Sequence, residues 1–383
     1  MPVNDDHVIV RPTHLSICNA DQRYYQGTRD PEVLAKKLPM ALIHEGVGIV
    51  ARDACGQFKA GDPVVMIPNT PFEEDPFIAE NYLRSSKFRA SGFDGFMQDN
   101  VAMRRDRVIR LPETIDREVA AFIEIISVSN HAIDRFDRFS HGRKDHIAVW
   151  GDGNLAFITS LLLRHRYPDS HICIMGVNHD KMINFTFVDE TYDVRKIPGD
   201  IVIDHAFECV GGNGAIKAID QIIDHIRPEG TIALLGVSEN PVPVNTRMIL
   251  EKGLRVFGSS RSGRKDFENT VNLLAAHPEM VAGTDRICTQ LMAAFGDRIF
   301  CKSGASAFYA VGIKDKGIGI ALKMEDGASS IVPYAILSVL TQLGVITPEE
   351  ACSLPRYHDK NLYNNHHAVV GRTELAFQLE QLC

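Results

Sequence analysis

Three residues of types that bind transition metals stand far apart in the sequence, each in its own local setting: Cys18 in SICNAD, His44 in LIHEGVG and Glu124 in FIEIISVSNHAI. A catalytic zinc ion takes three protein ligands and leaves a fourth position for water or substrate. There it can polarise a carbonyl and stabilise a developing alkoxide. Taken singly, each residue also fits an ordinary role: a small core cysteine, a buried histidine, or a charge on a helix surface.

The strongest single motif is a glycine-rich turn. The apolar run IAVW leads directly into GDGNLA at residues 151–156 and then into the helical pattern FITSLLLRH. Gly151 permits the tight turn, Gly153 lets the backbone approach a pyrophosphate, and the closing alanine lets strand and helix pack closely. At the helix start, Asn154 and Leu155 would present backbone amides to the phosphates. The alternative is a turn without a ligand, but the surrounding strands and helices favour dinucleotide binding.

The next strand pattern, HICIMG, bears on the choice of dinucleotide. It ends at Gly176 without an acidic residue that could bind a ribose 2′-hydroxyl. A 2′-phosphate is therefore not repelled, and Asn178, His179 and Lys181 could contact it. The sequence favours NADPH, with NADH as the alternative if Asp180 supplies the acid.

Different patterns of elements would position these groups. Residues 1–143 contain short β-type runs broken by glycine and proline, whereas residues 144–276 alternate apolar strands with helix-length segments. That alternation predicts a doubly wound parallel sheet covered on both faces. Residues 277–383 mix short strands, glycine turns and an amphipathic helix. We expect an α/β chain of three domains with these boundaries, the last of them an α+β segment.

The composition is that of a globular protein: 383 residues, 45% hydrophobic, with a formal net charge of −8. This charge argues against nucleic-acid binding, and no run approaches the ~20 apolar residues of a membrane helix. The start, MPVNDDHVIVRP, does not resemble a secretory signal. The eight cysteines form no CxxC pair, which suggests thiols and one metal ligand rather than a disulfide framework. We expect a cytoplasmic protein.

The stretch HEGVGIVARDACGQFKAGDPV follows the zinc alcohol dehydrogenase signature. With SICNAD and GDGNLA, it makes residues 8 to about 276 resemble the medium-chain dehydrogenases and reductases. The likeness is greater to the ribulose-5-phosphate reductases of ribitol-phosphate (teichoic acid or capsule) biosynthesis, in stretches such as SICNADQRYYQGTRD and IAENYLRSSKFRASGFDGFMQD. It implies a GroES-like catalytic domain, then a Rossmann domain, and reduction of D-ribulose 5-phosphate to D-ribitol 5-phosphate by NADPH.

The resemblance also implies roles for the metal-ligand residues. Cys18, His44 and Glu124 would hold the catalytic zinc ion, with Glu45 as a fourth or alternating ligand. Asp21 would support the metal or a substrate hydroxyl from behind the ligands.

Further residues would bind the nicotinamide, the phosphates or a partner. The resemblance places Cys209, Gly211, Gly236 and the GSSRSG loop at 258–263, with Ser259 and Arg261, against the nicotinamide. Candidate phosphate contacts are Arg23, Arg29 and Arg261. The resemblance also implies that this chain forms a homodimer through the edge of the nucleotide-domain sheet. It further implies a cytidylyltransferase of the same pathway as a partner.

The chain departs from this family at several points. Ile43 stands where the broad signature has glycine, and residues 69–95 contain no cysteine for a structural zinc lobe. The family's segment that returns to complete the catalytic domain is missing. In its place HPEMVAGTDRICTQLM, KGIGIALKMEDGA and VVGR resemble the C-terminal part of rhizobial-type (type II) L-asparaginases, which puts a junction near Ala275 to His277. Lys323 would match a motif lysine there, but the N-terminal part of that family, which carries its SxxK nucleophile segment, is not here.

Three functions follow from these patterns. The first is a zinc-dependent reductase of a sugar phosphate. The second is an L-asparagine amidohydrolase built on the C-terminal segment, although nucleophilic catalysis needs an activated hydroxyl beside a base. The third is a chain that binds nucleotide and catalyses nothing. Metal content and NADPH oxidation distinguish them.

Overall fold

The structure is a computed structural model that describes residues 6–278, 280, 291, 292, 294–304, 308–323, 332–354, 360–363 and 369–373. The chain divides into two compact units, residues 1–177 with 190–278 and residues 178–189 with 279–383. The division into three domains stays a prediction. Within the described ranges, no helix is both long and apolar enough to span a lipid bilayer.

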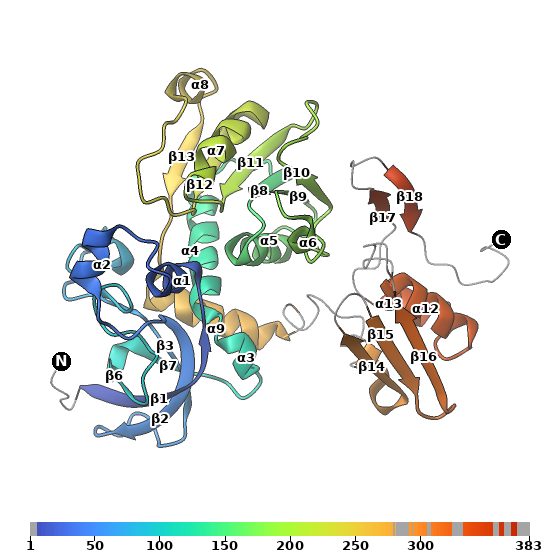
Figure 1. Ribbon diagram of the computed structural model, residues 1–383, viewed down its shortest axis with the longest axis horizontal. Coiled ribbons are helices and arrows are strands. Elements are labelled where there is room, and N and C mark those ends of the chain that lie inside the picture. Colours follow the sequence, from blue (N-terminus) through green and yellow to red (C-terminus); the bar gives the residue numbers. More distant parts are fainter. Residues whose placement is uncertain are drawn as a thin grey trace. The chain divides into compact units, whose positions relative to one another are not determined.

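The first part of unit 1 is a five-stranded antiparallel sheet in the order β6-β1-β2-β3-β7. Side chains such as Val8, Val10 and Phe96 form its core. The predicted short strands are therefore confirmed. Their bounds are β1 His7–Ser16, β2 Glu45–Asp53, β3 Pro63–Met66, β6 Val101–Arg104 and β7 Val108–Arg110 (Figure 1).

Short elements between these strands carry much of the candidate site. The antiparallel pair of β4 and β5 is only two residues long in each strand, and Asp30 caps α2 by accepting the N–H groups of Glu32 and Val33. The bounds are α1 Asn19–Tyr25, α2 Pro31–Lys37, β4 Asn69–Thr70, η1 Glu80–Tyr82, β5 Lys87–Phe88, η2 Arg105–Arg107 and α3 Arg117–Ala120.

The second part of unit 1 is a six-stranded parallel sheet in the order β10-β9-β8-β11-β12-β13, which confirms the doubly wound sheet. The edge strand β10 was not predicted, because its four residues, ETYD, are polar. The strands are β8 His146–Trp150, β9 His171–Gly176, β10 Glu190–Asp193, β11 Ile203–Glu208, β12 Ile226–Leu234 and β13 Arg255–Gly258. The helices are α5 Asn154–Arg166, α7 Gly214–His225, α8 Thr246–Glu251 and α9 Arg264–Ala276 (Figure 1).

Helix α4, Ile123–Phe139, belongs to both parts of unit 1. Its contacts reach β2 of the antiparallel sheet, and it packs along α5 and α9 beside the parallel sheet (Figure 1). Buried Ile126, Ile133 and Phe136 supply the apolar face. Glu124, in its first turn, is therefore positioned by both sheets.

Unit 2 has a core of its own, in which Val311 and Ile313 pack with Ile336 and Leu340. Thr347 and Glu350 form a capping box for α13 in the stretch TPEEA. Cys301 is disulfide-bonded, so the expectation of thiols alone is wrong at this position. The elements are α6 His179–Met182, η3 Gly296–Arg298, β14 Ile299–Gly304, β15 Phe308–Ile313, β16 Ile318–Lys323, α12 Val332–Gln342, α13 Pro348–Ser353, β17 Lys360–Tyr363 and β18 Val369–Thr373.

Candidate metal and nucleotide site

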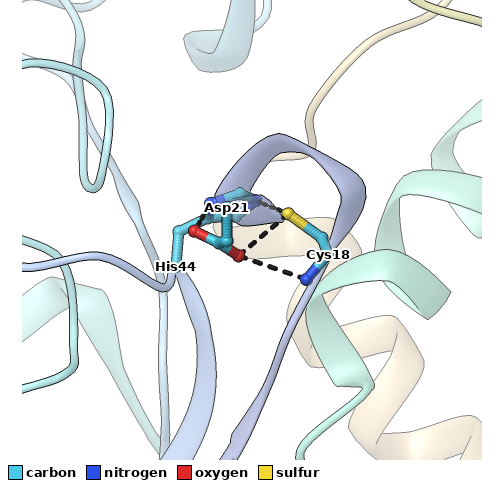
Figure 2. Close-up of side chains that lie close together, drawn as sticks. All are labelled: Cys18, Asp21 and His44. Atoms are coloured by element: carbon cyan, nitrogen blue, oxygen red, sulfur yellow. Dashed lines mark hydrogen bonds and ion pairs between the residues drawn. The ribbon is translucent and has the colours of Figure 1, made fainter. Parts of the chain in front are cut away.

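The pairing of β1 with β2 brings Cys18 and His44 together. Ser16, at the end of β1, is paired with Glu45, at the start of β2. Cys18 follows β1 and His44 precedes β2, so both lie at the same edge of the sheet. Their side chains face each other, with 3.7 Å between Cys18 Sγ and His44 Nε2 (Figure 2).

Asp21 is the centre of the hydrogen bonds in this cluster. Its Oδ2 accepts the Cys18 N–H at 3.2 Å and lies 3.0 Å from Cys18 Sγ. Its Oδ1 accepts the Ile43 N–H at 2.9 Å. The same oxygen lies 4.0 Å from His44 Nδ1 (Figure 2). The carboxylate is 3% exposed. It therefore orients both candidate ligands from behind, as the sequence analysis expected of Asp21.

The residue before His44 has an unusual backbone. Ile43 has a φ of 69°, in the left-handed region that a β-branched residue rarely adopts. This explains physically why glycine suits the position. Two hydrogen bonds hold the conformation, one from the Ile43 N–H to Asp21 and one from the Phe96 N–H to the Ile43 carbonyl oxygen at 2.6 Å.

Two overlapping sets of candidate ligands surround the His44 ring. Cys18, Asp21 and His44 each offer one ligand atom within 4.8 Å of the others, and so do His44, Glu45 and Glu124. Among the described residues, no such set contains both Cys18 and Glu124. The predicted ligands thus converge on His44, and coordination of one ion by Cys18, His44 and Glu124 together stays a prediction.

The electrostatics of this cluster fit a cation. Asp21, Glu45 and Glu124 are 3%, 2% and 6% exposed. Burial raises the pKa of Glu45 to about 7, with a further increase from the Asp21 charge, while the Ser16 hydrogen bond opposes the rise. Burial also raises the pKa of Glu124, and the charges of Glu45 and Asp21 add to it. So many buried acids, with a thiol beside them, suit a divalent cation that offsets their charge.

The histidine and the thiol respond to the same burial. Desolvation lowers the pKa of His44, and the positive charge of Arg261 lowers it further, which favours the neutral imidazole that binds metals. Desolvation and the Asp21 carboxylate raise the pKa of Cys18. Without a cation the thiol therefore keeps its proton, and metal binding would release it.

Arg261 brings the nucleotide part of unit 1 to this cluster. Its guanidinium lies 4.8 Å from the centre of the Phe88 ring, and that ring also packs edge-on against His44. Its charge opposes the rise in the pKa of Glu124. Arg23 and Arg29 differ, because each already approaches a carboxylate oxygen of Glu239, at 3.1 and 3.6 Å.

The glycine-rich turn has the expected geometry. Gly151 has a φ of 132° and its N–H donates to the Met175 carbonyl oxygen at 2.8 Å. A Cβ at Gly151 would lie 3.2 Å from the Ala156 Cβ and 3.2 Å from the Cys209 backbone. Gly153 is the N-cap of α5, whose first two residues are Asn154 and Leu155. A side chain at Gly151 would be crowded by these atoms and strained by the positive φ, which fits the glycine of the motif.

Glu208, which the sequence analysis missed, organises the predicted nicotinamide segments. Its buried carboxylate accepts the N–H groups of Val210 and Gly211 at 2.9 and 2.8 Å, and that of Gly236 at 3.2 Å. Cys209 is buried beside these segments, and burial raises the pKa of its thiol. The available signal was an acid at the end of the apolar strand IVIDHAFE.

Glu80 and Asn81, which were not predicted as site residues, hold the 258–263 loop. In this loop Ser259 is buried and Arg261 has a φ of 57°. The Asn81 side-chain amide donates to the Ser260 carbonyl oxygen at 3.1 Å. The Arg264 N–H donates to Glu80 Oε1 at 2.6 Å. Residues of η1 therefore fasten this loop to the antiparallel part.

The end of β9 has an acid that comes from elsewhere in the chain. Asp152, inside the glycine-rich turn, accepts the Val177 N–H at 2.8 Å. Asn178 caps α6 by accepting the Lys181 N–H at 3.2 Å. Because Asn178 and Lys181 belong to unit 2, their contact with a nucleotide stays a prediction.

Comparisons with protein families confirm both resemblances. The family described as alcohol dehydrogenase GroES-like domain matches residues 4–113, and the family described as zinc-binding dehydrogenase matches residues 175–276. The family described as L-asparaginase II matches residues 250–375.

Individual relatives narrow the first resemblance. A ribulose-5-phosphate reductase of Bacillus spizizenii is 58% identical over 279 residues, which are 73% of this chain and 82% of that protein. Ribulose-5-phosphate reductase 1 of Staphylococcus aureus is 56% identical, again covering 73% and 82%. The crystal structure of S. aureus TarJ in complex with NADPH superposes with a TM-score of 0.65 at 49% identity, covering 74% of this chain and 83% of that one.

Proposed function

Since the chain belongs to the zinc-binding dehydrogenase family with a GroES-like domain, we propose that it reduces D-ribulose 5-phosphate to D-ribitol 5-phosphate with NADPH. The main support for this proposal is a cluster of metal-ligand side chains beside the loop that contains Arg261. The cluster consists of Cys18, Asp21, His44, Glu45 and Glu124. The high identity to ribulose-5-phosphate reductases supports the choice of substrate.

The reaction is a balanced two-electron reduction. Bound NADPH would supply the hydride for the ketone carbon and leave as NADP⁺, and a proton from solvent would complete the new hydroxyl group of the polyol phosphate. A zinc ion bound by Cys18, His44 and Glu124, with Glu45 as a fourth or alternating ligand, would polarise the carbonyl. Asp21 orients Cys18 and His44, so the ligands need little reorganisation when the substrate arrives.

The nucleotide part would bind and orient the cofactor. The first turn of α5, after Gly153, supplies amides for the pyrophosphate, and Glu208 fixes the backbone of Gly211 and Gly236 beside the nicotinamide. Asn178 and Lys181 are the candidates for the 2′-phosphate. The NADPH-bound structure of S. aureus TarJ supports this choice of cofactor. Arg261 is our candidate for the substrate phosphate.

The test is oxidation of NADPH, followed at 340 nm, with D-ribulose 5-phosphate as substrate and zinc measured on the same sample. We expect turnover that is lost with a chelator and falls by more than about 100-fold in Cys18→Ser and His44→Ala. Cys55→Ser is the matched control, since Cys55 is exposed and outside the cluster. Activity that resists both the chelator and the substitutions would contradict the zinc-dependent mechanism. If NADPH raises the melting temperature but no turnover is seen, the chain binds the nucleotide without catalysing the reduction.

The finer assignments are part of the same proposal. We place the reaction in the cytoplasm, in the supply of ribitol phosphate for teichoic acid or capsule synthesis, with a homodimer and a cytidylyltransferase partner. Light scattering of the purified chain tests the dimer, and co-purification with the cytidylyltransferase tests the partner.

The L-asparaginase II match does not add a second proposed activity. It covers residues 250–375, and the N-terminal part of that family, which carries its SxxK nucleophile segment, is not matched. The SGRK string at 262–265 lies at the start of α9, and its Ser262 hydroxyl is hydrogen-bonded to that of Ser127. Lys323 ends β16, and its side chain lies outside the described residues. Release of ammonia from L-asparagine, lost in Lys323→Ala, would reopen this alternative.

A further inference from the structure

A second group of metal-ligand residues lies on the parallel sheet, away from the glycine-rich turn. His171 begins β9, Cys173 follows two residues later, and Glu190 begins β10. The strand register pairs Glu190 with Cys173 and pairs His171 with His146, the first residue of β8. Alternate residues of a strand share one face of a sheet. The four side chains therefore gather on one face at the amino ends of three adjacent strands, opposite to the carboxyl end of β8 where the glycine-rich turn begins.

The distances within this group fit coordination of one ion. A ring nitrogen of His171, the Sγ of Cys173 and a carboxylate oxygen of Glu190 all lie within 4.8 Å of one another. His171 Nε2 is 3.3 Å from Glu190 Oε2. Ligand atoms of a tetrahedral zinc ion, with bonds of about 2.0–2.3 Å, are about 3.3–3.8 Å apart. The three side chains therefore need only small movements to share an ion.

We propose that His171, Cys173 and Glu190 bind a structural zinc ion, with His146 as the fourth ligand. The His146 and His171 ring centres are 5.4 Å apart, close enough for a rotation of His146 to complete the tetrahedron. One thiolate, two imidazoles and one carboxylate suit zinc better than magnesium or calcium, which prefer oxygen ligands. This site is independent of the proposed reductase activity.

The surroundings of these ligands support a built site. The Tyr192 hydroxyl donates to Glu190 Oε2 and so orients the carboxylate, as groups behind metal ligands commonly do. Cys173 is 4% exposed, whereas the side chains of His171 and Glu190 are 37% and 40% exposed, so an ion has a route from solvent. The ion would fasten the polar edge strand β10 to β9 and β8. That strand is only four residues long and lies at the margin of the sheet.

Cobalt(II) absorption tests the site on the full-length chain. Cys18→Ser removes the thiolate of the other cluster, so a thiolate-to-cobalt charge-transfer band in this background should come from Cys173. We expect the band to disappear when Cys173→Ser is added and to weaken at least twofold when His171→Gln or Glu190→Gln is added. Adding Cys55→Ser should leave it unchanged. If Cys173→Ser does not fold, the substitutions at His171 and Glu190 still test the site, because these side chains are half-exposed and their replacement should be tolerated.

Two results would overturn the proposal. One is the absence of a thiolate band in the Cys18→Ser protein, and the other is a band that all three additional substitutions leave intact, which would assign it to another cysteine. Zinc gives a second readout, because a bound ion stabilises the folded state. Zinc added to the metal-free Cys18→Ser protein should raise its melting temperature, and the rise should be smaller with Glu190→Gln. An equal rise in both proteins would count against the site.

Discussion

At the scale of single residues, Asp21 matters because it controls the backbone that carries His44. Ile43 has a φ of 69°, and a residue with a Cβ in that region costs roughly 1–2 kcal/mol. The Asp21 carboxylate accepts the Ile43 N–H at 2.9 Å and so helps to hold this conformation. The position of the imidazole therefore depends on a side chain 23 residues earlier, which need not touch the metal itself.

We predict that Asp21→Asn weakens zinc binding by about 10- to 100-fold, the usual effect of removing a group that orients ligands. The amide has one oxygen in place of the two that Cys18 and Ile43 use. Competition with a chromophoric chelator measures the affinity. Asp30→Asn, at the exposed cap of α2, should leave the affinity unchanged. Equal zinc affinity in wild type and Asp21→Asn would show that Asp21 has no such role.

His205 makes stability depend on pH. Its Nε2–H donates to the Arg143 carbonyl oxygen and its Nδ1 accepts the Thr231 N–H, so the folded state needs a neutral ring. Burial, and then the charge of His141, lowers its pKa to about 4 from 6.5. The unfolded chain therefore binds the proton first. The stabilisation is complete above about pH 6.5 and decreases by up to about 3 kcal/mol as the pH falls towards 4.

Urea unfolding at pH 7 and pH 5 checks this prediction. The wild type should lose stability at the lower pH, and His205→Gln, which cannot bind the proton, should lose less. The same loss in both proteins would mean that other groups cause the pH dependence.

The sequence predicted the side chains that could touch a metal better than those that support the site. Cys18, His44 and Glu124 were found because their residue types and local motifs are chemically specific. Glu208 and Asn81 were not predicted, because their hydrogen-bond partners are backbone groups far away in the sequence. Glu208 accepts the Gly236 N–H, and Asn81 donates to the Ser260 carbonyl oxygen. Such partners become apparent only when the fold brings the segments together.

At the scale of elements, strand register decides the geometry of the cluster. The pairing of Ser16 with Glu45 sets Cys18 opposite His44. Gly95 lies against the segment before His44, where its N–H donates to the Ala41 carbonyl oxygen at 2.8 Å. A Cβ at Gly95 would lie 2.3 Å from the Ile43 carbonyl oxygen and 2.4 Å from that of Leu42. Backbone atoms cannot rotate away, so a side chain here would displace the segment before His44.

We predict that Gly95→Ala lowers both zinc content and thermal stability, because it moves the backbone on which His44 depends. Overpacking of this kind typically costs about 1–3 kcal/mol. Thermal unfolding and metal analysis measure the two effects. Gly142→Ala is the matched control, since nothing lies within 4 Å of a Cβ at that loop position. Full zinc content in Gly95→Ala would disprove the dependence.

Element prediction succeeded where the hydrophobic pattern was strong. The strands and helices around the glycine-rich turn agree with it because burial on both faces leaves long apolar runs. The edge strand β10 lacks such a run, and the two-residue strands β4 and β5 are too short to show a period. These strands form because a partner strand supplies their backbone hydrogen bonds: β9 for β10, and β4 and β5 for each other.

At the scale of the whole molecule, the chain has two compact units with separate cores. Val8 and Val64 belong to one core of unit 1, Trp150 and Ile222 to another, and Ile336 and Leu340 to that of unit 2. The sequence predicted resemblance to two families, and the family matches confirm it. It could not predict that residues 178–189 group with unit 2, because that depends on tertiary contacts.

We predict two unfolding transitions in calorimetry, of which NADPH shifts most the one that belongs to unit 1, because the glycine-rich turn and the first turn of α5 lie there. A ligand at 100 times its dissociation constant adds about 2.7 kcal/mol to the state that binds it. For a unit of this size, the melting temperature should rise by about 5–10 °C. NADH at the same concentration provides the comparison for the 2′-phosphate. A single transition that shifts as a whole would show that the two units unfold cooperatively.

The length of α4 has a mechanical consequence. Seventeen residues at 1.5 Å each make a rod about 25 Å long, with Glu124 in its first turn and its sides packed against α5 and α9. A tilt of about 5° around the far end would move that first turn by about 2 Å. This is roughly one metal–oxygen bond length, so a small rotation of the parallel sheet that carried α4 with it would be enough to bring the Glu124 carboxylate to a shared ion or to remove it.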